Sequence, residues 1–361
     1  MATDTYSFSA GPATLPEAVR AQIREDLRDW HGTGRSILET SQWDPRLLEM
    51  FEHVEADLRD LLEVPDGYTV LFLHGGASNQ FSMVPMNLLR GRDRADYVHT
   101  GMWSGKAIDD AGRYASVNIA ATTAESGFGH TPAQGELHLD PRAAYVHYTP
   151  VETADGVQFG YVPETGGVPL VADATAALLA MPLDIGRHAV VYASTQKNLG
   201  VVGMTVVIVR TELIGQALPG TPTTFDYAVH ERTRSRFTTP PIFAWYVTGL
   251  ILQWVRDHGG VPATLERSRR RAEIVYSAVD ASSMFTAPVE HSARAWTNVI
   301  FTMNEPALAE TLLEEAEKAG LHDLPGHSRV GGFRASLYLG MPTVGAEALA
   351  AYLADFERRH G

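Results

Sequence analysis

The sequence predicts an α/β protein: a large, mostly parallel sheet of the seven-stranded type flanked by helices, followed by a smaller α+β unit. In the first two-thirds of the chain, short apolar runs alternate with segments of helical periodicity, the pattern of parallel strands joined by helices. Beyond Gly259-Gly260, helices are interrupted by only two further strands. We therefore expect a large domain at 16–257 and a small C-terminal domain at 258–361, joined by an N-terminal arm at 1–15.

The elements follow in order from periodicity and from turn residues. Thr14 and Glu17 are spaced as a helix-capping box before a first amphipathic helix, and Asp44-Pro45 begins a second one. Seven apolar runs predict strands at 68–73, 95–99, 117–120, 145–148, 170–172, 190–192 and 205–209. The C-terminal part predicts helices at 265–279, 306–319 and 345–358 and strands at 297–301 and 333–338.

Composition excludes several classes of function. The formal net charge of −14 argues against binding to a nucleic-acid backbone. The absence of cysteine excludes disulfides, thiolate metal sites and persulfide chemistry, and no histidine–carboxylate cluster predicts a metal. No apolar run approaches the roughly 20 residues of a membrane span, and the N-terminus lacks a signal-peptide core, so we expect a cytoplasmic protein.

Two charged residues follow predicted strands and point to cofactor chemistry. Asp173 comes directly after strand 170–172, and Lys197 follows strand 190–192 at a distance of 24 residues from Asp173. A buried ammonium is costly unless it is paired or neutralised. Both residues suit pyridoxal phosphate, in which the acid pairs with the pyridinium nitrogen and the lysine forms a Schiff base. A surface lysine and a helix-capping aspartate remain the alternative.

Four further features are ambiguous when taken one at a time. Gly75-Gly76-Ala77-Ser78 joins a strand to a helix, where backbone N–H groups can approach a phosphate, although it could be an ordinary turn. Trp103 could cover a planar ring or be a core residue. Thr153 could contact the phenolic oxygen of the cofactor or belong to a turn. Arg334 could clamp a carboxylate or be solvated at an edge strand.

Together these residues belong to long, ordered motifs that resemble one family over nearly the whole chain. The sequence resembles the phosphoserine aminotransferase family, class-V aminotransferases with the fold-type I architecture of pyridoxal phosphate enzymes. The resemblance rests on Phe8-Ser9-Ala10-Gly11-Pro12-Ala13, His74-Gly75-Gly76-Ala77-Ser78, Ala193-Ser194-Thr195-Gln196-Lys197-Asn198, Thr238-Thr239-Pro240-Pro241-Ile242-Phe243-Ala244-Trp245-Tyr246 and Val330-Gly331-Gly332-Phe333-Arg334-Ala335-Ser336.

The resemblance implies catalytic roles at matching positions. Lys197 corresponds to the Schiff-base lysine that also shuttles the proton, and Asp173 to the residue that keeps the pyridine nitrogen protonated. Thr153 corresponds to the contact with the phenolic oxygen, and Trp103 to the residue that stacks on the ring. Arg334 matches the arginine that binds the α-carboxylate of the substrate.

The resemblance also implies how the cofactor phosphate is held. Ala77, Ser78 and Gln196 match residues that bind this phosphate. Thr238 and Thr239 match a segment that reaches the cofactor phosphate of the neighbouring subunit in a homodimer. The usual motif there is Asn-Thr, so Thr238 is a mild departure.

The residues that read the phosphate of the substrate depart more strongly from the family pattern. A His-Arg pair is replaced by Gln42 and Trp43, and the arginine expected directly after His327 is shifted by one residue to Arg329. Each lost charge-assisted hydrogen bond costs roughly 1.5–3 kcal/mol. Either Arg329 or Arg46 could substitute, and Trp43 would offer an apolar surface instead.

We therefore expect an aminotransferase that moves an amino group between glutamate or 2-oxoglutarate and a small 2-oxo acid related to 3-phosphohydroxypyruvate, with altered side-chain specificity. The first alternative is an authentic phosphoserine aminotransferase of serine biosynthesis. Two other classes stay open: a lyase or decarboxylase that uses the same cofactor, and a non-catalytic binding protein on the same fold.

Overall fold

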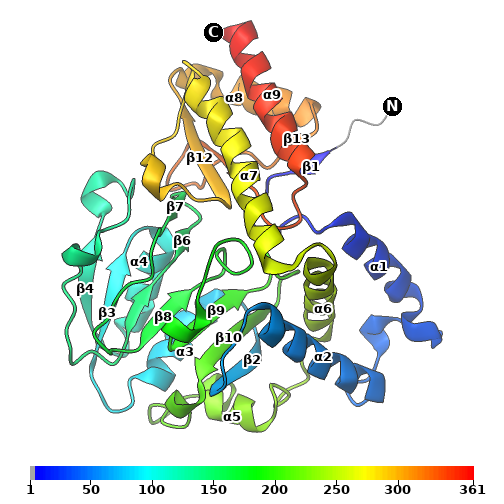
Figure 1. Cartoon of the computed structure of the whole chain (residues 1–361), viewed down its shortest axis with the longest axis vertical. Coiled ribbons are helices and arrows are strands. Elements are labelled where there is room, and N and C mark those ends of the chain that lie inside the picture. Colours follow the sequence, from blue (N-terminus) through cyan, green and yellow to red (C-terminus); the bar gives the residue numbers. More distant parts are fainter. Residues whose placement is uncertain (1–4) are drawn as a thin grey trace.

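The computed structural model describes residues 5–361 and contains the predicted sheet (Figure 1). Seven strands lie in the order β2-β10-β9-β8-β5-β3-β4, and β10 is antiparallel to both of its neighbours while the other pairs are parallel. Their bounds are β2 Tyr68–His74, β3 Arg94–His99, β4 Ser116–Thr122, β5 Val146–Tyr148, β8 Leu170–Asp173, β9 Val190–Ser194 and β10 Met204–Arg210. The predicted α/β fold class is confirmed, and all seven predicted strands belong to this one sheet.

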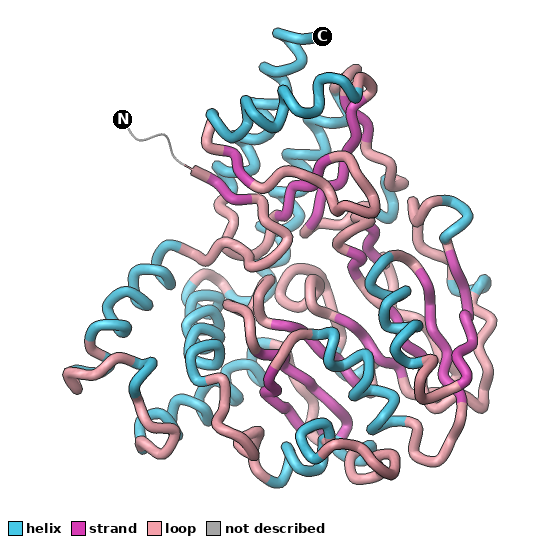
Figure 2. The backbone as a smooth tube through the Cα atoms, turned by 180° about the vertical axis from the view of Figure 1, so that it is seen from behind, coloured by secondary structure: helices cyan, strands magenta, loops and turns pink. Residues whose placement is uncertain are grey.

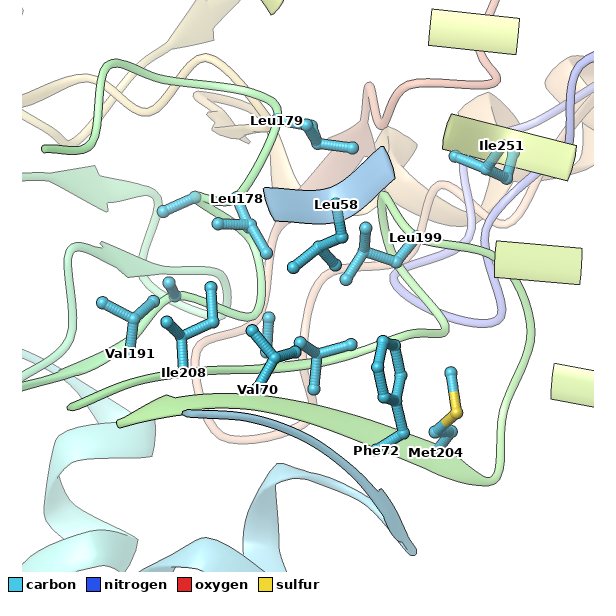
Figure 3. Close-up of a cluster of buried hydrophobic side chains, with 14 of the residues drawn as sticks. Leu58, Val70, Phe72, Leu178, Leu179, Val191, Leu199, Met204, Ile208 and Ile251 are labelled. Atoms are coloured by element: carbon cyan, nitrogen blue, oxygen red, sulfur yellow. The ribbon is translucent and has the colours of Figure 1, made fainter. Parts of the chain in front are cut away.

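Helices cover both faces of the sheet, which explains why its strands read as continuous apolar runs. The alternation of side chains along β2 shows this directly. Val70 and Phe72 join one hydrophobic cluster with residues of α2 (Pro45–Leu61) and α6 (Ile242–Asp257), as Figure 3 shows. Leu71 and Leu73 join another with residues of α3 (Ala77–Leu88) and α4 (Met102–Ala111).

A second, smaller assembly contains a three-stranded sheet in the order β11-β12-β14. Figure 2 shows this assembly above the large sheet. It contains β11 Phe285–Thr286, β12 Asn298–Met303, β14 Phe333–Ser336, α7 Gly260–Ala281, α8 Ala309–Lys318 and α9 Thr343–His360. Its core includes Phe8 from the N-terminal arm. The arm is fixed there because β1 (Tyr6–Ser7) pairs with β13 (Leu321–His322).

The start of the first helix differs from the prediction. Helix α1 spans Glu17–Arg28 and is preceded by Pro16, with no side-chain capping bond. The hydroxyl of Thr14 instead donates to the carbonyl of Ser7 at 3.3 Å, so the expected capping box with Glu17 is wrong. The hydroxyl of Thr14 therefore forms a hydrogen bond within the N-terminal arm and does not cap the helix, although its spacing from Glu17 had predicted a cap.

Several short elements besides β11 and β13 were not expected from periodicity. Strands β6 (Val151–Glu152) and β7 (Val157–Gln158) form a hairpin, and α5 covers Tyr227–Arg232. Within residues 5–361, no helix combines the length and the apolar character needed to cross a bilayer.

Candidate active site

The two charged residues singled out in the sequence lie at the carboxyl ends of neighbouring strands. Asp173 is the last residue of β8, and Lys197 follows the end of β9 by three residues. Strands β8 and β9 are paired in parallel, and both side chains are buried, with 5% and 9% of their surface exposed. Open α/β sheets gather their binding sites at this edge.

The structure leaves this buried carboxylate and this buried ammonium without an ion pair. Oxygen Oδ1 of Asp173 accepts hydrogen bonds from the backbone N–H and the hydroxyl of Thr175, at 3.1 and 2.6 Å. The ammonium of Lys197 donates to the hydroxyl of Thr153 at 3.3 Å. Within the part of the chain that the structure describes, no carboxylate forms a salt bridge with Lys197.

Burial shifts both groups toward their neutral forms. It lowers the pKa of Lys197 to about 8, although the charges of Asp173 and Glu152 oppose this shift. Burial also raises the pKa of Asp173, against the hydrogen bonds from Thr175 and the charge of Lys197. Asp173 and Lys197 interact electrostatically without direct contact. This arrangement suits a flat cofactor that binds the lysine at one end and presents a pyridinium nitrogen to the aspartate at the other.

Trp103 and Thr153 form a wall beside Lys197. The indole N–H of Trp103 donates to the hydroxyl of Thr153 at 2.9 Å. The Lys197 ammonium lies 5.7 Å from the centre of the Trp103 ring and 6.0 Å from that of Tyr338. The structure thus brings together the predicted lysine, aspartate, tryptophan and threonine.

Two carboxylates that sequence reasoning missed hold Trp103 in place. Glu152 is buried and accepts hydrogen bonds from the backbone N–H groups of Trp103 and Ser104, at 2.9 and 2.8 Å. Asp155 accepts one from Met102 at 2.9 Å. These donors belong to the first turn of α4, where no intrahelical acceptor exists. In the sequence, the only sign of this role was that Glu152 is adjacent to Thr153. The residues that Glu152 binds, Trp103 and Ser104, are about 50 residues away along the chain.

The glycine turn between β2 and α3 has the geometry of a phosphate-binding loop. Gly75 has φ +92°, and a Cβ atom there would lie 2.2 Å from the side-chain nitrogen of Asn79. Ala77 and Ser78 begin α3, so their N–H groups have no intrahelical acceptor. Such N–H groups at the positive end of a helix bind anions.

Gln196, Thr238 and Thr239 are the other residues predicted to contact the cofactor phosphate. Gln196 accepts a hydrogen bond from the hydroxyl of Ser194, which closes β9. Thr238 and Thr239 are exposed. The hydroxyl of Thr238 lies 3.5 Å from Nδ1 of His74, at the end of β2 in the same chain. Contact with a neighbouring subunit stays a prediction.

Cationic groups gather on the substrate side of the site. The guanidinium of Arg334 donates to the carbonyl of Thr153 at 3.5 Å. Partial burial, together with the charges of Arg334, Lys106 and Arg329, lowers the pKa of His327. Lys106 and Arg329 line an adjacent cavity of about 590 Å³ together with the carboxylates of Asp109 and Asp155, whereas Lys197, Thr153 and Arg334 do not line it. The ammonium of Lys106 lies 4.7 Å from the Trp103 ring centre. Sequence reasoning missed Lys106, which lies one helical turn after Trp103.

The loop of Gln42 and Trp43 is not brought to this site within one chain. Trp43 is 69% exposed, and no hydrogen bond among residues 5–361 involves the side chain of either residue. Arg46, which was considered as a substitute cation, donates to both carboxylate oxygens of Asp44 at 3.0 and 2.8 Å. Arg46 is therefore already paired, whereas Arg329 lies beside His327.

Comparison with known proteins agrees with this geometry. Residues 5–349 match the family model of class-V aminotransferases. A phosphoserine aminotransferase of Laribacter hongkongensis is 48% identical over 357 residues, which cover 99% of each chain. The chain belongs to the phosphoserine aminotransferase family of class-V aminotransferases. It is a pyridoxal phosphate-dependent transaminase, as the sequence motifs predicted.

Solved structures of the family have the same fold. The phosphoserine aminotransferase from Bacillus circulans subsp. alkalophilus superposes with a TM-score of 0.96 at 36% identity, over 99% of both chains. A pyridoxal phosphate-bound phosphoserine aminotransferase from Trichomonas vaginalis has a TM-score of 0.93 at 30% identity, over 97% of this chain and all of the other. The prediction of the cofactor is confirmed, and these relatives give no support to a lyase, a decarboxylase or a purely binding protein.

Proposed function

We propose that the enzyme is a phosphoserine aminotransferase, which moves an amino group between glutamate or 2-oxoglutarate and 3-phosphohydroxypyruvate. The observation that carries this proposal is the similarity to phosphoserine aminotransferases over the full length of the chain. It favours the alternative reading of the sequence over the expected change of acceptor. The cations Lys106 and Arg329, which lie near His327 and Arg334, support it, because a phosphorylated substrate needs positive charge there.

Residues at the strand ends are proposed to hold the cofactor. When bound, pyridoxal phosphate supplies an aldehyde for the lysine and a ring that withdraws electrons from the substrate. Asp173 would face the ring nitrogen, and Trp103 and Thr153 would contact the ring and its phenolic oxygen. The first turn of α3, with Ala77 and Ser78, would bind the phosphate together with Gln196, Thr238 and Thr239.

Lys197 is proposed to move the proton between the substrate carbon and the cofactor. An amine does this only when it is unprotonated, and burial brings its pKa down to about 8. Around pH 8 and above, a substantial share of Lys197 is thus available as a base. The charge of Asp173, stabilised by Thr175, would keep the facing nitrogen protonated.

Substrate recognition is proposed to use two anion sites. Arg334 would bind the α-carboxylate with its planar guanidinium fork, since its guanidinium makes no salt bridge within residues 5–361. His327, Arg329 and Lys106 would bind the phosphate of the side chain. Arg329 would then replace the arginine that the family has directly after His327. Lys106 would replace the positive charge that the family has in the Gln42-Trp43 loop.

A homodimer is proposed to complete the site. Trp43, Thr238 and Thr239 are exposed in the single chain. A large exposed aromatic side chain is typical of an interface residue. We propose that Gln42 and Trp43, together with the two threonines, act on the site of the neighbouring subunit.

Steady-state kinetics with phosphoserine, serine and alanine as amino donors to 2-oxoglutarate tests the substrate. We expect kcat/KM for phosphoserine on the order of 10⁴ M⁻¹s⁻¹ or above, and at least about 100-fold above the unphosphorylated donors. A preference for serine or alanine would refute the proposal and favour the expectation that the enzyme has an altered side-chain specificity.

Variants Arg329→Gln and Lys106→Gln test the phosphate site in the same assay. Each should lower kcat/KM for phosphoserine by roughly 10- to 100-fold, the value of one charge-assisted hydrogen bond. The half-reaction with glutamate, which carries no phosphate, serves as the internal control. Lys318→Gln removes a lysine at the end of α8 and is the matched surface variant.

A further inference from the structure

A second cavity of about 720 Å³ lies outside the site described above. Its walls come from the N-terminal arm, the start of α1, the end of α6, helix α7 and the segment 339–343 that leads into α9, which converge in Figure 1. The cavity therefore touches both the large assembly and the small one.

Helix α7 presents two arginines to this cavity. Arg271 is only 4% exposed; it donates to the carbonyl of Met341 at 3.0 Å, and its Nε group has no hydrogen-bond partner within residues 5–361. Arg267 lies one turn earlier, and donates to the carbonyl of His258 at 3.0 Å. Its second terminal nitrogen is buried and likewise lacks a partner in the described chain. Its guanidinium stacks 5.3 Å from the ring centre of Trp254.

The charge of these two arginines is not balanced by the described residues. Burial lowers the pKa of both, and for Arg271 the neighbouring charge of Arg267 contributes, so that its pKa is about 10. Both are charged at neutral pH, because a guanidinium group is not deprotonated there. Of the other ionisable side chains at the cavity, Glu17 already pairs with Arg20 and Arg24, and the ring of His322 contacts Glu317.

A buried charge without a counter-ion is strongly destabilising, and a bound anion removes most of that cost. Guanidinium groups bind phosphate through two parallel N–H bonds, and two of them one turn apart on a helix can bind the same group. We propose that this cavity binds a small phosphate-type oxyanion between Arg267 and Arg271. The anion would link the arm, α7 and the segment before α9, and it would stabilise the enzyme without entering the active site.

Thermal unfolding of the holoenzyme in increasing inorganic phosphate tests the proposal, with chloride at equal ionic strength as the reference. We expect a saturable rise in Tm of a few degrees, because a ligand that binds only the folded state stabilises it by mass action. In the Arg329→Gln background, in which the proposed substrate phosphate site is weakened, Arg267→Gln and Arg271→Gln should each abolish the rise. Arg270→Gln, which removes an exposed arginine from the same helix, should keep it.

Further variants separate this cavity from other phosphate sites. Arg329→Gln weakens the proposed substrate site and should leave the rise intact. The absence of a rise in the wild type, or a rise that survives both Arg267→Gln and Arg271→Gln, would overturn the proposal. Asp4 lies outside the described residues, and it precedes Thr5, which lines the cavity. A rise that is present only in Asp4→Asn would show that the chain supplies its own anion, which would also overturn it.

Discussion

At the scale of single residues, the buried lysine beside a buried aspartate is the clearest sign of the chemistry. Because we propose that Lys197 both binds the cofactor and moves the proton, Lys197→Ala should lower kcat at least about 10³-fold. The absorbance of the lysine-bound cofactor should disappear as well. Lys318→Ala, a surface change, should retain both, and near-normal turnover in Lys197→Ala would contradict the assignment.

The low pKa of Lys197 also predicts how the cofactor-free protein responds to pH. The lysine titrates near 10.5 when unfolded and near 8 when folded, so between these values the unfolded state binds more protons. Stability therefore rises with pH through this window, by up to about 3 kcal/mol. Urea unfolding of the apoenzyme should show this rise, and Lys197→Met should lack it. If the free energies of unfolding of the wild type and of Lys197→Met differ by the same amount at every pH from 8 to 10.5, this account is wrong.

At the scale of an element, the N-terminus of α4 positions Trp103 through a carboxylate. Glu152→Ala would leave the N–H groups of Trp103 and Ser104 buried without acceptors. Each such group costs about 1–3 kcal/mol, so we expect a loss of roughly 2–5 kcal/mol in the free energy of unfolding. Denaturant unfolding measures this loss, and weaker cofactor binding should accompany it. Glu125→Ala at an exposed site is the control, and an equally small effect of both variants would refute the role.

At the scale of the whole molecule, a hybrid dimer tests whether subunits share a site. One subunit carries Lys197→Ala and the other carries Thr238→Ala with Thr239→Ala. If the threonines serve the partner's cofactor, the hybrid contains one complete site, and its cofactor affinity should match that of the wild type. The homodimer of the threonine variant should bind the cofactor at least about 10-fold more weakly than the wild type, because it loses the free energy of at least one hydrogen bond. Equal weakness in hybrid and homodimer would place the threonines at their own subunit's site.

The domain division belongs to the same scale and stays a proposal. We propose boundaries at 16–257 and 258–361, supported by the end of α6 at Asp257 and by two main hydrophobic clusters. Ala295, Tyr338 and Leu339 of the C-terminal part pack in the first cluster, where the two parts meet. Phe8 packs in the C-terminal cluster, which supports an N-terminal arm that joins the small domain.

Periodicity located the strands of the main sheet because both faces of most of these strands are buried, which forces continuous apolar runs. The edge strand β4 is the exception, since most of its side chains are exposed or half-buried. It also placed Asp173 and Lys197 at strand ends. Glu152, Asp155 and Lys106 escaped prediction because each acts through partners that are distant in sequence or on another element. The loop of Gln42 and Trp43 was expected at the substrate, yet one chain leaves it exposed.

The sequence by itself determined the fold class, the family and the cofactor, because each rests on local patterns and ordered motifs that survive without coordinates. Only the tertiary structure decided which charges lack a charged partner among residues 5–361: the separated Asp173 and Lys197, the cations around His327, and the arginines of α7. The physical reason is that the energy of a charge depends on its burial and on its neighbours in space. Neither can be read from the order of residues along the chain.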